Sequence, residues 1–138
     1  MAGAVAVLCC VLGCGGGGHS KKKFAGTYSG PFLVSRRGTM PPDFNPPSGG
    51  TATATVTRSG ALTVDFGDSY LLTAQLVESG SATSGAITYP STTGPKTFPA
   101  LVGWGEDDGQ RKVSAFIEFD FPSGSAVFAA QLTRDPSN

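Results

Sequence analysis

Cysteine is missing from most of this chain of 138 residues, because its three cysteines are Cys9, Cys10 and Cys14. The residues from 15 onward therefore form no disulfide among themselves and hold no thiolate metal site or cysteine nucleophile. Histidine is scarcer still, since His19 is the single one and nothing beside it completes a set of metal ligands. We read His19 as a linker residue, and the sequence predicts no metal and no other cofactor.

An excess of charge of one sign is also lacking. Ten basic and ten acidic residues cancel, and charged residues make up 14 % of the chain. Nucleic acid is not an expected partner, because its binding needs a net basic surface that neutralises phosphates.

Patterns that indicate enzyme chemistry are equally sparse. No glycine-rich phosphate loop precedes a helix, because no segment has a convincing helical pattern. Glu118 and Asp120 share one face of an expected strand at about 7 Å, and we interpret them as cross-strand partners of basic residues. The acidic run 106–108 lacks the alternating spacing of a calcium loop and is interpreted as a hairpin tip. We therefore expect no enzymatic activity.

From Phe24 onward the apolar residues recur with a period of two, which is typical of half-buried strands. The stretch RKVSAFIEFDFP (111–122) shows it best, with Val113, Ala115, Ile117 and Phe119 on one face. Eight such segments are expected, at 24–35, 51–58, 61–66, 70–77, 81–89, 96–104, 111–122 and 125–134. Short glycine-containing turns separate most of them, so neighbouring strands should be antiparallel.

These segments predict an all-β, single-domain fold, in which about eight strands form an up-and-down meander that closes into a barrel. A two-sheet β-sandwich is the alternative. The first strand contains Gly26-Thr27-Tyr28. This G-x-Y opening resembles the G-x-W start of lipocalin and avidin barrels, with tyrosine in place of tryptophan, and the resemblance covers those few residues alone.

Two proline-containing stretches interrupt the pattern. Residues 35–50 contain four prolines and are expected to form a long loop that carries Phe44. Residues 92–99 are expected to be a loop or an edge. Tyr28, Phe44 and Trp104 are the aromatic residues that we single out as candidate contacts for a ligand or a partner, against the simpler interpretation that they belong to the core.

The amino-terminal segment has a different character. Residues 2–12 are almost purely apolar but too short to span a bilayer, which needs roughly 20 residues. The sequence Val11-Leu12-Gly13-Cys14 that follows resembles the lipobox of bacterial lipoproteins, although leucine is usual at its first position and no basic residue stands near Met1. The resemblance implies a signal peptide at 1–13, a lipidated Cys14 in a flexible tether at 14–23, and a β domain at 24–138.

Lys21, Lys22 and Lys23 end this tether, and each contributes about 1 kcal/mol of attraction to an anionic bilayer surface. We therefore expect a protein anchored in the bacterial cell envelope by lipid, at the outer membrane, with secretion as the alternative. Its expected role is structural or in protein interaction, with an envelope protein as partner. The alternative function is a small barrel that binds an apolar or amphipathic ligand.

Overall fold

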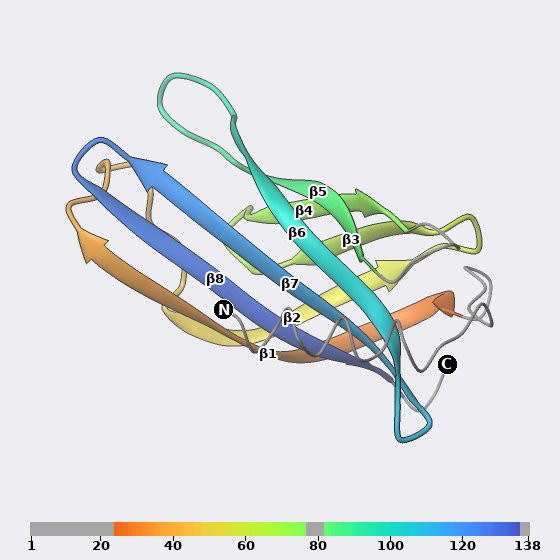
Figure 1. Ribbon diagram of the computed structural model, residues 1–138. Helices are drawn as coiled ribbons and strands as arrows, with labels where there is room; N and C mark the ends of the chain where they lie inside the picture. Colours follow the sequence, from red (N-terminus) through yellow and green to blue (C-terminus); the bar gives the residue numbers. More distant parts are fainter. Residues whose placement is uncertain (1–23, 77–81, 136–138) are drawn as a thin grey trace.

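The computed structural model describes residues 24–76 and 82–135, which form a closed antiparallel barrel. Its strands follow one another in chain order around the barrel (Figure 1). They are β1 (Gly26–Gly38), β2 (Gly49–Val56), β3 (Ala61–Asp65), β4 (Leu71–Gln75), β5 (Ala82–Tyr89), β6 (Lys96–Asp107), β7 (Gln110–Phe121) and β8 (Gly124–Arg134). The all-β meander predicted from the sequence is confirmed as a barrel, and the sandwich alternative is wrong.

Alternation of buried and exposed residues explains why these segments form strands. In β3 the side chains of Leu62 and Val64 are buried between exposed neighbours, and β7 buries Val113 and every second residue through Phe119. A sheet of such strands keeps one face out of water when it packs against another layer or curls around that face, and here it curls. The buried side chains of all eight strands accordingly meet in one core inside the barrel.

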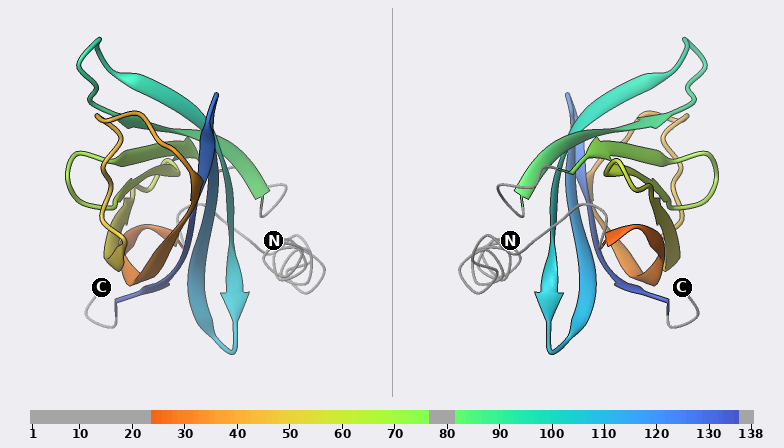
Figure 2. Two further views of the ribbon diagram at one scale, coloured as in Figure 1. Left: turned by 90° about the vertical axis from the view of Figure 1, so that its left-hand side faces the viewer. Right: turned by 90° about the vertical axis from the view of Figure 1, so that its right-hand side faces the viewer.

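Pairing of β1 with β8 closes the barrel (Figure 2). β1 also pairs with β2, from Gly26↔Val56 to Leu33↔Gly49. A Cβ atom at Gly30 would collide with the backbone carbonyl oxygen of Gln131 on β8. Glycine at this position therefore allows the two backbones to approach each other closely.

Two expected boundaries are wrong. The loop predicted at 35–50 is shorter, because β1 continues to Gly38 against β8 and β2 begins at Gly49. The irregular stretch predicted at 92–99 ends before residue 96, because β6 begins at Lys96, where the strand predicted at 96–104 also begins. Pro99 pairs with Ala86 on β5. The pairing of β6 with β7 begins one residue later, at Ala100, so the missing N–H of Pro99 interrupts no hydrogen-bond ladder between β6 and β7.

The loop between β1 and β2 closes one end of the barrel, which we call the loop end. Phe44 projects inward from it and is 4 % exposed. Its ring lies 4.9–5.8 Å from the ring centroids of Tyr70, Tyr89, Phe119 and Phe121. Hydrogen bonds fix the loop around this ring, since the Asn45 amide donates to the Tyr70 hydroxyl at 2.8 Å and Thr92 donates to the Asp43 carboxylate.

Replacing Phe44 by alanine should destabilise the barrel by about 3–5 kcal/mol, because it leaves a cavity among four aromatic rings. Chemical denaturation measures the change, with Leu33→Ala as the control at a residue that is 70 % exposed. Equal stability of the two variants would show that Phe44 is not a structural plug.

Candidate functional site

The three aromatic candidates do not form one site. Phe44 lies at the loop end, whereas Tyr28 lies near the start of β1 and Trp104 near the end of β6, at the opposite end of the barrel. All three rings are buried. Phe44 is therefore part of the core in this structure. We call the opposite end of the barrel, at which β1 begins, the Phe24 end.

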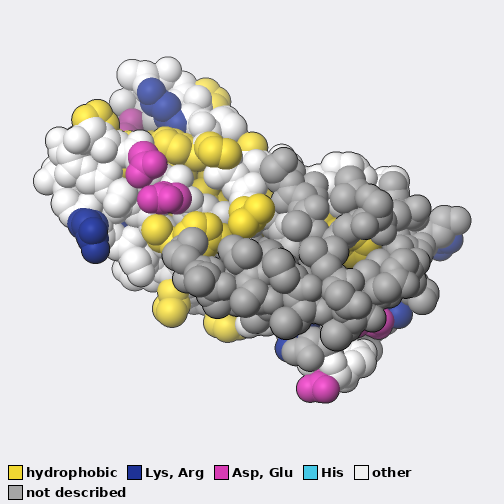
Figure 3. Space-filling view, viewed as in Figure 1, with side chains coloured by type: hydrophobic (Ala, Val, Ile, Leu, Met, Phe, Trp, Pro, Cys, Tyr) yellow, Lys and Arg dark blue, Asp and Glu magenta, His cyan; other side chains and the backbone are white. Residues whose placement is uncertain are grey.

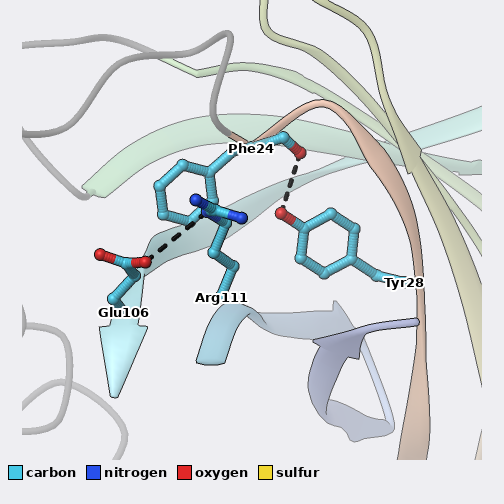
Figure 4. Close-up of polar contacts among 4 residues, drawn as sticks. All are labelled: Phe24, Tyr28, Glu106 and Arg111. Atoms are coloured by element: carbon cyan, nitrogen blue, oxygen red, sulfur yellow. Dashed lines mark hydrogen bonds and ion pairs between the residues drawn. The ribbon is translucent and has the colours of Figure 1, made fainter. Parts of the chain in front are cut away.

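A compact group of polar and aromatic side chains closes the Phe24 end (Figure 4). The Tyr28 hydroxyl donates a hydrogen bond to the backbone carbonyl of Phe24 at 2.8 Å. The Phe24 ring packs edge-on against Trp104, with 4.5 Å between ring centroids. The Arg111 guanidinium lies 6.0 Å from the centroid of the Phe24 ring, and Nε of Arg111 is 3.6 Å from Oε2 of Glu106. Phe24 thus plugs this end as Phe44 plugs the other.

Burial makes the Tyr28 hydroxyl a much weaker acid than free tyrosine. Desolvation of the phenolate raises the pKa of Tyr28 to about 12, and the positive charges of Arg134 and Arg111 offset part of the rise. The hydroxyl therefore stays protonated at neutral pH, where it acts as a hydrogen-bond donor and not as a base.

An open hollow of about 460 Å³ adjoins this group. All of its lining residues except Gly109 carry polar or charged side chains, and they are Ser29, Gly109, Gln110, Arg111, Thr133, Arg134 and Asp135. The Ser29 hydroxyl donates to the Asp135 carboxylate at 2.7 Å. Nε of Arg111 and Nε of Arg134 are buried, and neither has a hydrogen-bond partner in the structure. These two guanidinium groups are the chemically distinctive feature of the hollow.

An apolar row crosses the outer face of four strands. Leu33 on β1 pairs with Ala129 on β8, Ala129 pairs with Phe116 on β7, and Phe116 pairs with Leu101 on β6. We call these four residues the outer apolar row. Leu33 is 70 % exposed and Leu101 is 40 % exposed. Figure 3 shows hydrophobic side chains gathered over β6, β7 and β8 on this side of the molecule.

Two carboxylates flank the row. Glu118 and Asp120 follow Phe116 on the outward face of β7, as the alternation predicts. The expected pairing with basic residues is wrong, because their partners on β8 are Val127 and Ser125. Both side chains are exposed and point away from the barrel.

The sequence analysis missed the hollow that contains Arg111 and Arg134, and it missed the outer apolar row. Arg134 lies opposite Tyr28 in the β1–β8 register, and this proximity depends on closure of the barrel. The row had a visible signal, because Leu33 and Phe116 are large apolar residues out of phase with the buried positions of their strands.

The predicted lipidation site Cys14 and the three lysines, Lys21, Lys22 and Lys23, lie outside the described residues. Within residues 24–76 and 82–135, no helix has the length and hydropathy to cross a membrane. In the same ranges, no three His, Cys, Asp or Glu side chains converge as ligands for a metal ion.

Comparisons with known proteins add little. No protein-family model matches the chain, and no curated protein matches it. Among solved structures, the chain is similar to an LTBP1 mutant in complex with leukotriene C4, with 15 % identity, a TM-score of 0.42, and coverage of 87 % of this chain and 72 % of that one. A similarity this low carries no inference about what the present protein binds.

Replacing Tyr28 by phenylalanine should lower the free energy of unfolding by about 1 kcal/mol at neutral pH, because the Phe24 carbonyl loses its donor. The raised pKa of Tyr28 also predicts that wild-type stability is full below pH 10 and falls as the pH rises through about 12. The variant should lose less stability across this interval. Denaturation at alkaline pH and the absorbance of phenolate check both points, and a Tyr28 that ionises near pH 10 would contradict them.

Proposed function

We propose that this protein is a lipid-anchored component of the bacterial cell envelope whose barrel acts through its outer surface. The observation that carries the proposal is that aromatic side chains of the chain itself occupy the barrel. Phe44 and Phe24 plug its two ends, and Phe128 contacts four further rings between them. An interior packed in this way favours a scaffold over a carrier of an internal apolar ligand.

The anchor follows from the sequence around Cys14. The lipobox-like residues Val11-Leu12-Gly13-Cys14 and the lysines Lys21, Lys22 and Lys23 lie on the chain before Phe24. A single acyl chain holds a protein to a bilayer only weakly, so a multiply acylated cysteine beside a basic cluster is the physically sensible combination.

Replacing Cys14 by serine should move the protein from the detergent phase to the aqueous phase, because the attachment point for lipid is lost. Detergent-phase partitioning measures the change, and the intact mass of the mature wild-type chain shows whether acylation and cleavage before Cys14 have occurred. Replacing Cys10 by serine, the matched control, should leave partitioning unchanged. Retention of the Cys14→Ser chain in the detergent phase would contradict the anchor.

The outer apolar row is the surface that we assign to a protein partner. Exposed apolar groups in a contiguous patch are characteristic of interaction sites. Glu118 and Asp120 beside the row repel an anionic bilayer and complement basic side chains. The chemistry of the surface therefore fits a protein with an apolar centre and lysine or arginine on the side that meets these carboxylates.

A photo-crosslinking residue at position 33 or 101 should trap this partner in intact cells, whereas one at position 71 should not. Leu71 is the matched control, because it is 42 % exposed on β4, outside the row. Replacing Glu118 by lysine should abolish the crosslink by reversing the local charge, and the identified partner should then bind the purified protein with the same dependence. The assignment would be refuted by a crosslink that Glu118→Lys does not affect, or by one that is equally strong at position 71. A crosslinked product that contains two copies of this chain would also refute it.

A further inference from the structure

The hollow at the Phe24 end contains a half-buried cation, Arg134, one of whose donors has no partner. Arg134 lies beside Tyr28 in the register of β1 and β8, and its Nε is buried without a hydrogen-bond partner. A guanidinium has five N–H donors and no acceptor. A buried donor left unsatisfied costs more than an ordinary hydrogen bond contributes. A ligand that supplies acceptor atoms from the hollow would remove this cost.

The other charges around the hollow define what that ligand can be. Glu106 lies against Arg111 and offsets its charge. Asp135 also lines the hollow, with one oxygen occupied by the Ser29 hydroxyl. A carboxylate in the lining opposes a doubly charged anion more than a singly charged one. The two guanidinium groups and the two carboxylates cancel, so the hollow accepts a singly charged ligand with several oxygen acceptors more readily than a doubly charged one.

We propose that the hollow binds the phosphodiester group of an anionic phospholipid, with Arg134 and Arg111 donating to its oxygens. A phosphodiester carries a single negative charge, and the planar fork of a guanidinium matches its two free oxygens. The polar lining and the volume of about 460 Å³ suit a headgroup of this kind better than an acyl chain.

The hollow lies near such a lipid if the chain is anchored at Cys14, and this part of the inference rests on the proposed function. Phe24 follows Cys14 by ten residue-to-residue steps (24 − 14), which span at most about 35 Å when extended. Phe24 itself plugs the end of the barrel at which the hollow opens, with Arg111 over its ring. A chain anchored at Cys14 therefore holds this end within reach of the bilayer surface.

Binding can be measured on the full chain carrying Cys14→Ser, so that no acyl anchor contributes. The probes are vesicles of phosphatidylglycerol, the soluble diester glycerophosphoglycerol, and inorganic phosphate. Trp104 is the one tryptophan of the chain, and its fluorescence reports on the site because its ring packs against Phe24. Co-sedimentation with the vesicles gives a second readout that does not depend on fluorescence.

Replacing Arg134 by glutamine should weaken binding of the vesicles and of glycerophosphoglycerol by about tenfold or more, since a charge-assisted pair is lost. Arg58→Gln, which removes the same charge from an exposed turn, should change it less than about twofold. Both variants should unfold at the same denaturant concentration as the parent, which separates binding from folding.

Inorganic phosphate distinguishes the source of the anion. Tighter binding of the diester than of phosphate supports the lipid headgroup, whereas tighter binding of phosphate overturns it in favour of a free anion. Binding that is the same in the Arg134→Gln and Arg58→Gln chains overturns the site altogether. Failure of the anchor is recognised separately, because it appears as an unacylated Cys14 in the intact mass of the wild-type chain and leaves the binding of glycerophosphoglycerol unaffected.

Discussion

The pairing of β1 with β8 is the contact on which the rest of the structure depends. Without it the meander would end in two unpaired strand edges, with the inward side chains facing water. The pairs run from Tyr28↔Arg134 to Gly38↔Gly124, along most of both strands. Glycine at position 30 makes the close approach feasible. Closure also brings together groups that are far apart in the sequence: Arg134 comes to lie beside Tyr28, and Leu33 beside Ala129.

A closed barrel still has two open ends, and in this protein residues outside the strands cover both. Phe44 comes from the loop after β1, and Phe24 precedes β1. Each ring is buried and lies edge-on or tilted against other rings, a geometry that aromatic groups prefer. Both ends of the barrel therefore contribute to the core. The surfaces left for binding are the hollow at the Phe24 end and the outer apolar row.

Much of the fold could be predicted from the sequence because alternation is a local property. Val113, Ala115, Ile117 and Phe119 identify one face of β7 without knowledge of any other strand, and Asp108-Gly109 identifies the turn before it. Closure was predicted by a different argument, since eight hairpin-linked strands leave exposed edges unless the first pairs with the last.

The elements that escaped prediction depend on pairing between distant strands. The four prolines of 35–50 predicted one loop over the whole stretch, but residues through Gly38 pair with β8. Pro99 is accepted in β6 because the neighbouring strand starts its pairing one residue later. The hollow and the outer apolar row both need the register of β1, β8 and β7, which alternation alone does not define.

The hollow and the outer apolar row can both be occupied, because they lie at different positions along β7. Arg111 is near its start at the Phe24 end, Phe116 is five residues farther along (116 − 111), and Asp120 is nine residues away (120 − 111). At about 3.3 Å per residue, Asp120 is roughly 30 Å from Arg111 along the strand. This separation exceeds the screening length of about 8 Å at physiological salt. The carboxylates beside the row would therefore not weaken an anion held by the arginines, and the proposed anchor at the Phe24 end would leave the proposed protein-binding row free.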